Sequence, residues 1–209
     1  MKKALSIIAF IFFLCQSLIG QENLFARIAD NYFRANPFDR EYSKFLQFFM
    51  NDPTIINKKI VKKTDSTFFS FTAEYKNHSP FSFVADRTEI RLMEKEMEFG
   101  DSISVIDTVF IYQLLGYKYG KGGEEEVKKE FNKFNRRFKN DFYTDQHSDI
   151  LKNEEVVGGV INYFVLFADV SPISISWAKA DDFQSFFSIV FRFKLRQNLA
   201  VLPIPSDGR

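Results

Sequence analysis

The sequence predicts an α+β protein in which an N-terminal pair of helices and one long helix pack on a curved, mainly antiparallel sheet. Residues 185–202 alternate between apolar and polar side chains, as in a strand with one buried face. Residues 124–141 instead place apolar side chains at the spacing of one helix face. Because a sheet with one solvated face needs helices on its other face, the two patterns fit one layered domain.

Length and composition are those of a folded globular protein. The chain has 209 residues, of which 45% are hydrophobic and 26% are charged, enough for one sizeable domain. Its 27 phenylalanines favour a sheet-rich core, since aromatic side chains fit pleated, half-buried surfaces. The alternative is an exposed aromatic binding surface.

The N-terminus is typical of a secretory signal peptide. Lys2 and Lys3 precede an apolar run over 4–14, and Gly20 supplies a small residue for cleavage. We therefore predict a signal peptide over 1–20 and a mature domain over 21–209. The apolar run is too short for a membrane-spanning helix, so we expect no transmembrane span in the mature chain.

Charge and cysteine content limit the partners further. Cleavage after Gly20 leaves 26 basic and 27 acidic residues, a net charge of −1, which does not favour nucleic acid. Cys15 is the only cysteine, so no intrachain disulfide can form. The expected location is secreted or periplasmic. A lipid anchor through Cys15 is the alternative, but the residues before it are not the small ones that usually precede a lipidated cysteine.

Two short helices are predicted next. Apolar residues recur at helical spacing over 24–33, and Pro37 ends that run because the residue before a proline avoids the helical conformation. Asp39 is a suitable N-cap for a second helix that extends to Asn51. Together they would cover one face of the sheet.

Strands are predicted over 55–61, 67–75 and 81–85, followed by a hairpin over 89–114 that turns at Gly100 and Asp101. The first arm of the hairpin, 89–98, fits either a strand or a helix face. Its glutamate-rich composition favours a helix, so both alternatives stay open.

Glycines at 116, 120, 122 and 123 are predicted to end the hairpin before a helix over 124–141. Three glutamates at its start and basic residues near its end complement the helix dipole. Residues 144–155 read as a polar loop. Strands over 156–168, 173–180 and 185–202 should then form a meander, with Phe191 facing the core and Arg192 facing solvent.

The order of these elements resembles the nuclear transport factor 2-like cone fold, in which helices cover the concave face of a curved sheet. The segment Phe45-Leu-Gln-Phe-Phe-Met-Asn-Asp52-Pro is similar to one in secreted bacterial proteins of unknown function that carry such domains. Those proteins usually have a glutamine and an arginine where this chain has Ile56 and Lys59. The resemblance implies a fold and no catalytic residue.

A short internal repeat in the sequence suggests an alternative domain organisation. The spacing of Phe134, Phe138, Asn140 and Asp141 repeats that of Phe45, Phe49, Asn51 and Asp52. One interpretation is two small related halves with a boundary near residue 120. The other is chance, because Asn is common at helix ends.

No motif for catalysis, a cofactor or a metal is found. The glycine-rich segment 116–122 is one residue short of a phosphate loop and lacks its serine or threonine. Asp145, His147 and Asp149 alternate along the chain in no closed zinc pattern. We therefore predict no metal and no cofactor.

The candidate site consists of polar or amphipathic side chains on otherwise apolar strand faces. A buried polar group without a partner costs about 1–3 kcal/mol, so each of them is paired, at an edge, or lining a cavity under the helices. The candidate ligand-binding residues are Asp107, Tyr112, Gln113, Asn162, Tyr163, Trp177 and Gln197.

Two functions follow from this set. The first is a secreted or envelope binding protein without enzymatic activity, whose partner is an apolar small molecule or an envelope protein. The alternative is a cone-fold enzyme that uses Asp107 as the general base in a dry cavity.

Overall fold

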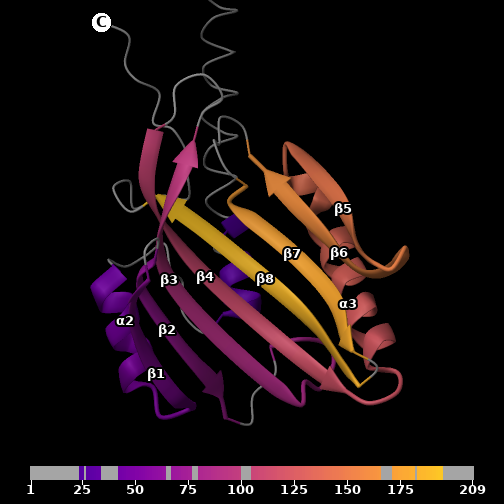
Figure 1. Ribbon diagram of the computed structural model, residues 1–209, viewed down its shortest axis with the longest axis horizontal. Helices are drawn as coiled ribbons and strands as arrows, with labels where there is room; N and C mark the ends of the chain where they lie inside the picture. Colours follow the sequence, from indigo (N-terminus) through magenta and orange to yellow (C-terminus); the bar gives the residue numbers. More distant parts are fainter. Residues whose placement is uncertain are drawn as a thin grey trace, which may run out of the picture.

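In the part of the chain that the structure describes, eight strands form one antiparallel sheet (Figure 1). The computed structural model describes residues 24–25, 27–33, 42–64, 67–76, 80–99, 105–165, 171–181 and 183–194. Its strands are β1 (Ile55–Thr64), β2 (Thr67–Tyr75), β3 (Arg87–Phe99), β4 (Val105–Tyr119), β5 (Thr144–Lys152), β6 (Glu155–Phe164), β7 (Ile173–Asp181) and β8 (Gln184–Lys194).

The strand order is β1-β2-β3-β4-β8-β7-β6-β5. Strands β1 to β4 form one antiparallel meander and β5 to β8 form another, so the meander predicted for the last three strands is confirmed. The two meanders join where β4 pairs with β8, from Val109 opposite Lys194 to Tyr119 opposite Gln184.

All helices that the structure describes lie on one face of the sheet, which we call the inner face (Figure 1). They are the helical residues 24–25 and 27–32, α2 (Tyr42–Asn51), and α3 (Gly123–Phe138), which continues into the 3-10 turn η2 (Lys139–Asp141). The long helix α3 packs against β8, β7 and β4. Three glutamates occupy its first turn, as predicted, and Gly122 precedes it in the left-handed conformation.

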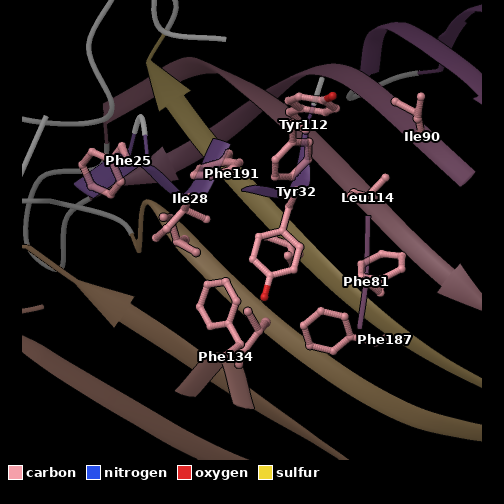
Figure 2. Close-up of a cluster of buried hydrophobic side chains, with 14 of the residues drawn as sticks. Phe25, Ile28, Tyr32, Phe81, Ile90, Tyr112, Leu114, Phe134, Phe187 and Phe191 are labelled. Carbon is pink, nitrogen blue, oxygen red and sulfur yellow. The ribbon is translucent and has the colours of Figure 1, made fainter. Parts of the chain in front are cut away.

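The core fills the space between the helices and the inner face. Tyr112 and Phe191, which lie opposite each other on β4 and β8, are fully buried there. Figure 2 shows Tyr32 reaching from the N-terminal helical residues toward Phe134 of α3. The alternation predicted for the last strand is confirmed for its described part, where Phe187, Ile189 and Phe191 face inward.

The first arm of the long hairpin is a strand. Ile90 and Leu92 are both fully buried, and β3 pairs with β4 along its whole length from Arg87 to Phe99. Pairing with a central strand and burial of alternate residues outweigh the helical preference of its glutamates.

Two predictions about the middle of the chain are wrong. Residues 81–85 form no strand; they run past the end of β4, with the rings of Phe81 and Phe83 stacked 5.2 Å apart. Gly116 does not end the hairpin but lies within β4. A Cβ atom at Gly116 would lie 2.3 Å from Cε2 of Phe81, so this glycine makes room for the ring.

The predicted polar loop over 144–155 is also wrong, because it contains edge strand β5 and the start of β6. All nine side chains of β5 are exposed, so it has no apolar alternation that a sequence pattern would detect. Asn153 and Glu154 both have positive φ and make the short turn into β6.

Several predictions lie outside the described residues: the signal peptide over 1–20, Cys15, Asp39 and the turn at Gly100 and Asp101. The last strand is described as far as Lys194. Within the described ranges, no helix is both long and apolar enough to cross a bilayer.

Candidate functional site

Tyr112, from the candidate set, lies in the centre of the aromatic core. Its ring centroid is 4.2 Å from that of Phe33 and 5.0 Å from that of Phe45, and its side chain has no exposed surface. Burial, and then the neighbouring hydroxyl of Tyr75, raise the pKa of Tyr112 well above its ordinary value. The structure thus makes Tyr112 a core residue.

Tyr163 and Trp177 also point to the inner face. The Tyr163 hydroxyl donates to Oδ1 of Asn135 at 2.9 Å, and its ring stacks on Phe142 with centroids 4.5 Å apart. The Trp177 ring lies beneath the ammonium of Lys128, at 4.3 Å from its centroid, and is 6% exposed. These two aromatic side chains are packed by α3 and the chain that follows it.

Gln113 and Asn162 lie on the opposite, outer face of the sheet. Gln113 donates from Nε2 to Oγ of Ser188 at 2.9 Å, and Asn162 accepts at Oδ1 from Oγ of Ser174 at 2.6 Å. Both are therefore polar groups paired with a serine from another strand. The structure does not bring them together with Tyr112, Tyr163 and Trp177.

The structure does not describe the side chains of the two remaining candidates, Asp107 and Gln197. The backbone of Asp107 pairs with Met97 between β4 and β3, but its side chain lies outside the described residues, as does all of Gln197. The enzymatic alternative based on Asp107 stays a prediction.

The outer face of the central strands carries a patch without charged side chains. Residues directly opposite each other in an antiparallel sheet point to the same face, and two adjacent rows cross β4, β8, β7 and β6. We call these eight residues the outer patch: Gln113, Val190, Ser174 and Asn162 in one row, and Leu115, Ser188, Ser176 and Val160 in the other.

Five members of the outer patch remain partly exposed, whereas Ser174, Ser188 and Leu115 are buried by their neighbours. Sequence reasoning selected Gln113 and Asn162 but missed that they share a row. The missing information was strand register, because β4 and β6 are neighbours only through β8 and β7.

The row that contains Gln113 continues across β3 to Arg91 and enters a polar groove of about 590 Å³. The groove is lined by Asn57, Lys59, Thr72, Ala73, Glu74, Arg87, Glu89 and Arg91. It contains five charged side chains and borders the uncharged outer patch, because Arg91 lies opposite Gln113.

Glu89 organises this groove. It accepts from Arg87 Nη2 at 2.7 Å, from Arg91 Nε at 2.6 Å and from the Tyr117 hydroxyl at 3.1 Å. Burial alone would raise the pKa of Glu89, but the hydrogen bonds and charges of Arg91, Tyr117 and Arg87 outweigh it and lower that pKa. The two arginines are thereby fixed beside one carboxylate.

Arg192 lies at the other side of the outer patch. It points outward, as predicted. We expected it to be freely solvated, and that expectation is wrong. Its Nη1 donates to Oγ of Ser174 at 2.5 Å and to the carbonyl of Ser171 at 3.4 Å, and the side chain is partly buried. Burial lowers the pKa of the Arg192 guanidinium.

Asp145 and His147 meet on β5, with His147 Nε2 at 2.5 Å from Oδ2 of Asp145, and His147 is exposed. Among the residues that the structure describes, no group of three or more His, Cys, Asp or Glu side chains converges as a metal site would require. This pair therefore stands by itself at the sheet edge.

The chain matches no protein-family model, and comparisons with curated proteins and with solved structures find no significant match.

Proposed function

We propose that this chain is a secreted or cell-envelope binding protein without enzymatic activity, and that a protein partner docks on the outer face of its sheet. The observation that carries this proposal is the outer patch, whose eight side chains are uncharged and lie on the face opposite the described helices. Depletion of charge at the centre is a feature of protein interfaces.

The shape of the two faces favours a protein over an apolar small molecule. Small ligands bind in concave sites that bury most of their surface. On the inner face, however, Tyr112 and Tyr163 have no exposed surface, because neighbouring aromatic rings occupy the space beside them. A partner protein, by contrast, can cover a broad sheet face that is surrounded by a polar rim.

The polar groove would form part of that rim. Arg87 and Arg91 are already held by Glu89, so little side-chain freedom is lost when a partner contacts them. Secretion, which this proposal includes, is supported by the charged and apolar segments of residues 1–20.

The proposal is tested by photo-crosslinking in the intact source cell. A photoreactive amino acid is placed at Val190 or at Val160 in the outer patch, and at exposed Lys133 of α3 as the matched control. We expect one discrete protein adduct from both outer positions and none from position 133. Adducts from position 133 alone, or no adduct from either outer position, would contradict a partner on this face.

A second measurement addresses the apolar-ligand alternative. If a small molecule occupied the inner side, apolar compounds would shift the emission of Trp177, the only tryptophan, and raise the melting temperature. With a packed inner face, we expect a panel of uncharged lipids and uncharged aromatic metabolites to change neither signal. A compound that changes both would replace our proposal by the small-ligand function.

A further inference from the structure

Arg192 differs from the arginines of the groove because no carboxylate among the described residues accompanies it. Arg87 and Arg91 both bond to Glu89, whereas within the described residues the Arg192 side chain bonds to a serine hydroxyl and a backbone carbonyl. Burial lowers the pKa of its guanidinium. A partly buried cation without a counter-ion is unfavourable, so a charge partner from outside the described chain would stabilise it.

The Arg192 side chain is held in one orientation. Ser174 is 4% exposed and gives its hydroxyl proton to Asn162, which leaves its lone pairs free to accept from Nη1 of Arg192. Ser171, 6% exposed, is fixed in turn because its hydroxyl bonds to the carbonyls of Tyr163 and Ile173. The guanidinium therefore has a rigid support on one side.

The other donors of Arg192 have no partner in the described chain. No described acceptor bonds to Nε or Nη2, and neither nitrogen is fully enclosed. These two groups form one edge of the planar guanidinium, which matches the two oxygens of a carboxylate. Directly across from Arg192 lies Ile111, and across from Ile111 lies Met93, both partly exposed.

We propose that Arg192 is the centre of a carboxylate-binding subsite, which takes one monoanionic carboxylate on the Nε and Nη2 edge and its apolar body over Ile111 and Met93. A single guanidinium balances a single negative charge, which favours a carboxylate over a doubly charged phosphate. The subsite adjoins the outer patch through the bond of Arg192 to Ser174, but carboxylate binding there does not require the proposed protein partner. The carboxylate comes from a free amphipathic acid or from an acidic side chain, and the test separates these sources.

The test follows the Nε–H signal of Arg192 by NMR in the full mature protein while octanoate is added. Octanol is the uncharged control for octanoate, and N-acetylglutamate amide represents an acidic side chain. We expect octanoate to move the Arg192 signal in a saturable way, to leave that of exposed Arg136 unchanged, and to bind about tenfold more tightly than octanol.

Variants give a second readout. Arg192→Gln should weaken octanoate binding about tenfold, and Arg192→Lys should restore only part of the affinity because lysine cannot offer two parallel donors. Arg136→Gln on α3 is the matched control and should bind as the wild type does. Because the NMR titration uses the wild-type protein, the proposal stays testable even if Arg192→Gln does not fold.

The outcomes are distinguishable. Tighter binding of octanoate than of N-acetylglutamate amide supports a free acid, and the reverse supports an acidic side chain of a partner. If neither compound moves the Arg192 signal, or if octanol binds as well as octanoate, the subsite is wrong. The crosslinking result at Val190 is independent of both outcomes.

Discussion

Glu130 is the clearest case in which one residue holds separate parts of this molecule together. It lies on α3 with only 1% of its surface exposed. Its Oε1 accepts from the Tyr32 hydroxyl at 3.2 Å, and its Oε2 accepts from the amide of Ser82 at 3.0 Å and from the Ser82 hydroxyl. One carboxylate thereby ties the N-terminal helical residues and the segment 80–86 to the long helix.

Replacement of Glu130 should therefore be costly. Glu130→Ala leaves the buried Tyr32 hydroxyl and the part-buried amide of Ser82 without their acceptor, and we expect the free energy of unfolding to fall by about 3 kcal/mol. The control is Glu125→Ala on the same helix, which removes an exposed pair with Lys129 and should change the free energy of unfolding little. Urea denaturation measures both, and equal losses would contradict a structural role for Glu130.

Glu89 should make stability depend on pH. Its pKa is lower in the folded protein than the ordinary 4.5, so its ionised form stabilises the fold above that pH. This contribution is lost as the pH falls through the folded pKa. The stability difference between wild type and Glu89→Gln should therefore shrink from about pH 6 to about pH 3.

Glu96→Gln, at an exposed position of the same strand, is the control for this measurement. It should change the free energy of unfolding little at either pH. A stability difference between wild type and Glu89→Gln that grows on acidification would mean that the Arg87, Glu89 and Arg91 cluster does not exist in solution.

Among the elements, β4 and the segment 80–86 fit each other through Gly116. Gly116→Ala would drive a Cβ atom into the Phe81 ring, and we expect a loss of about 1–3 kcal/mol because a packed core does not yield freely. Combining it with Phe81→Leu, which removes the obstructing ring edge, should cost less than the sum of the two single changes. Strictly additive losses in thermal melts would argue against this contact.

The elements that sequence patterns predicted are those with a single clear periodicity. Strand β2 has the predicted bounds, and α3 begins one residue before its predicted start. By contrast, β5 has polar side chains on both faces. Residues 81–85 alternate like a strand, but their two aromatic rings stack on each other, and that of Phe81 covers Gly116 of β4. Prediction from the spacing of apolar residues fails where the buried side chains do not recur with the period of the helix or strand.

The candidate site was predicted only in part for the same reason. Polar residues on apolar strands were recognised individually, but the face to which each belongs depends on strand register. Glu130 carried a signal that we did not use, since it lies three residues after Val127 and four before Phe134, on the buried stripe of α3. Arg192 carried none, because its hydrogen-bond partners Ser171 and Ser174 lie about twenty residues away in the sequence, just before β7 and in it.

The whole molecule repeats one arrangement, a helix followed by a four-stranded meander, on each side of the β4 and β8 pair. The internal sequence repeat, which ends at Asp52 and at Asp141, lies at matching places in the two arrangements. Asp52 precedes the start of β1 by three residues, and Asp141 precedes the start of β5 by three. This repetition supports two related halves, which remain a prediction.

A chain split between residues 121 and 122 should reassemble. The break lies in an exposed turn, whereas β4 and β8 pair along eleven residues between the halves. We expect the fragments 21–121 and 122–209 to copurify when they are expressed together, and to be insoluble when they are expressed alone, since each exposes half of the core. Two soluble, independent fragments would show that the halves are separate domains.

The most direct test of a functional outer face is carbene footprinting of the protein in the intact cell, compared with the purified protein. Our account predicts that labelling at Val190, Val160 and Ile111 falls sharply in the cell, because a partner covers them. Exposed positions on α3, such as Lys129 and Lys133, should be labelled equally in both samples. Equal labelling of the outer face in both samples, or protection confined to α3, would contradict the account.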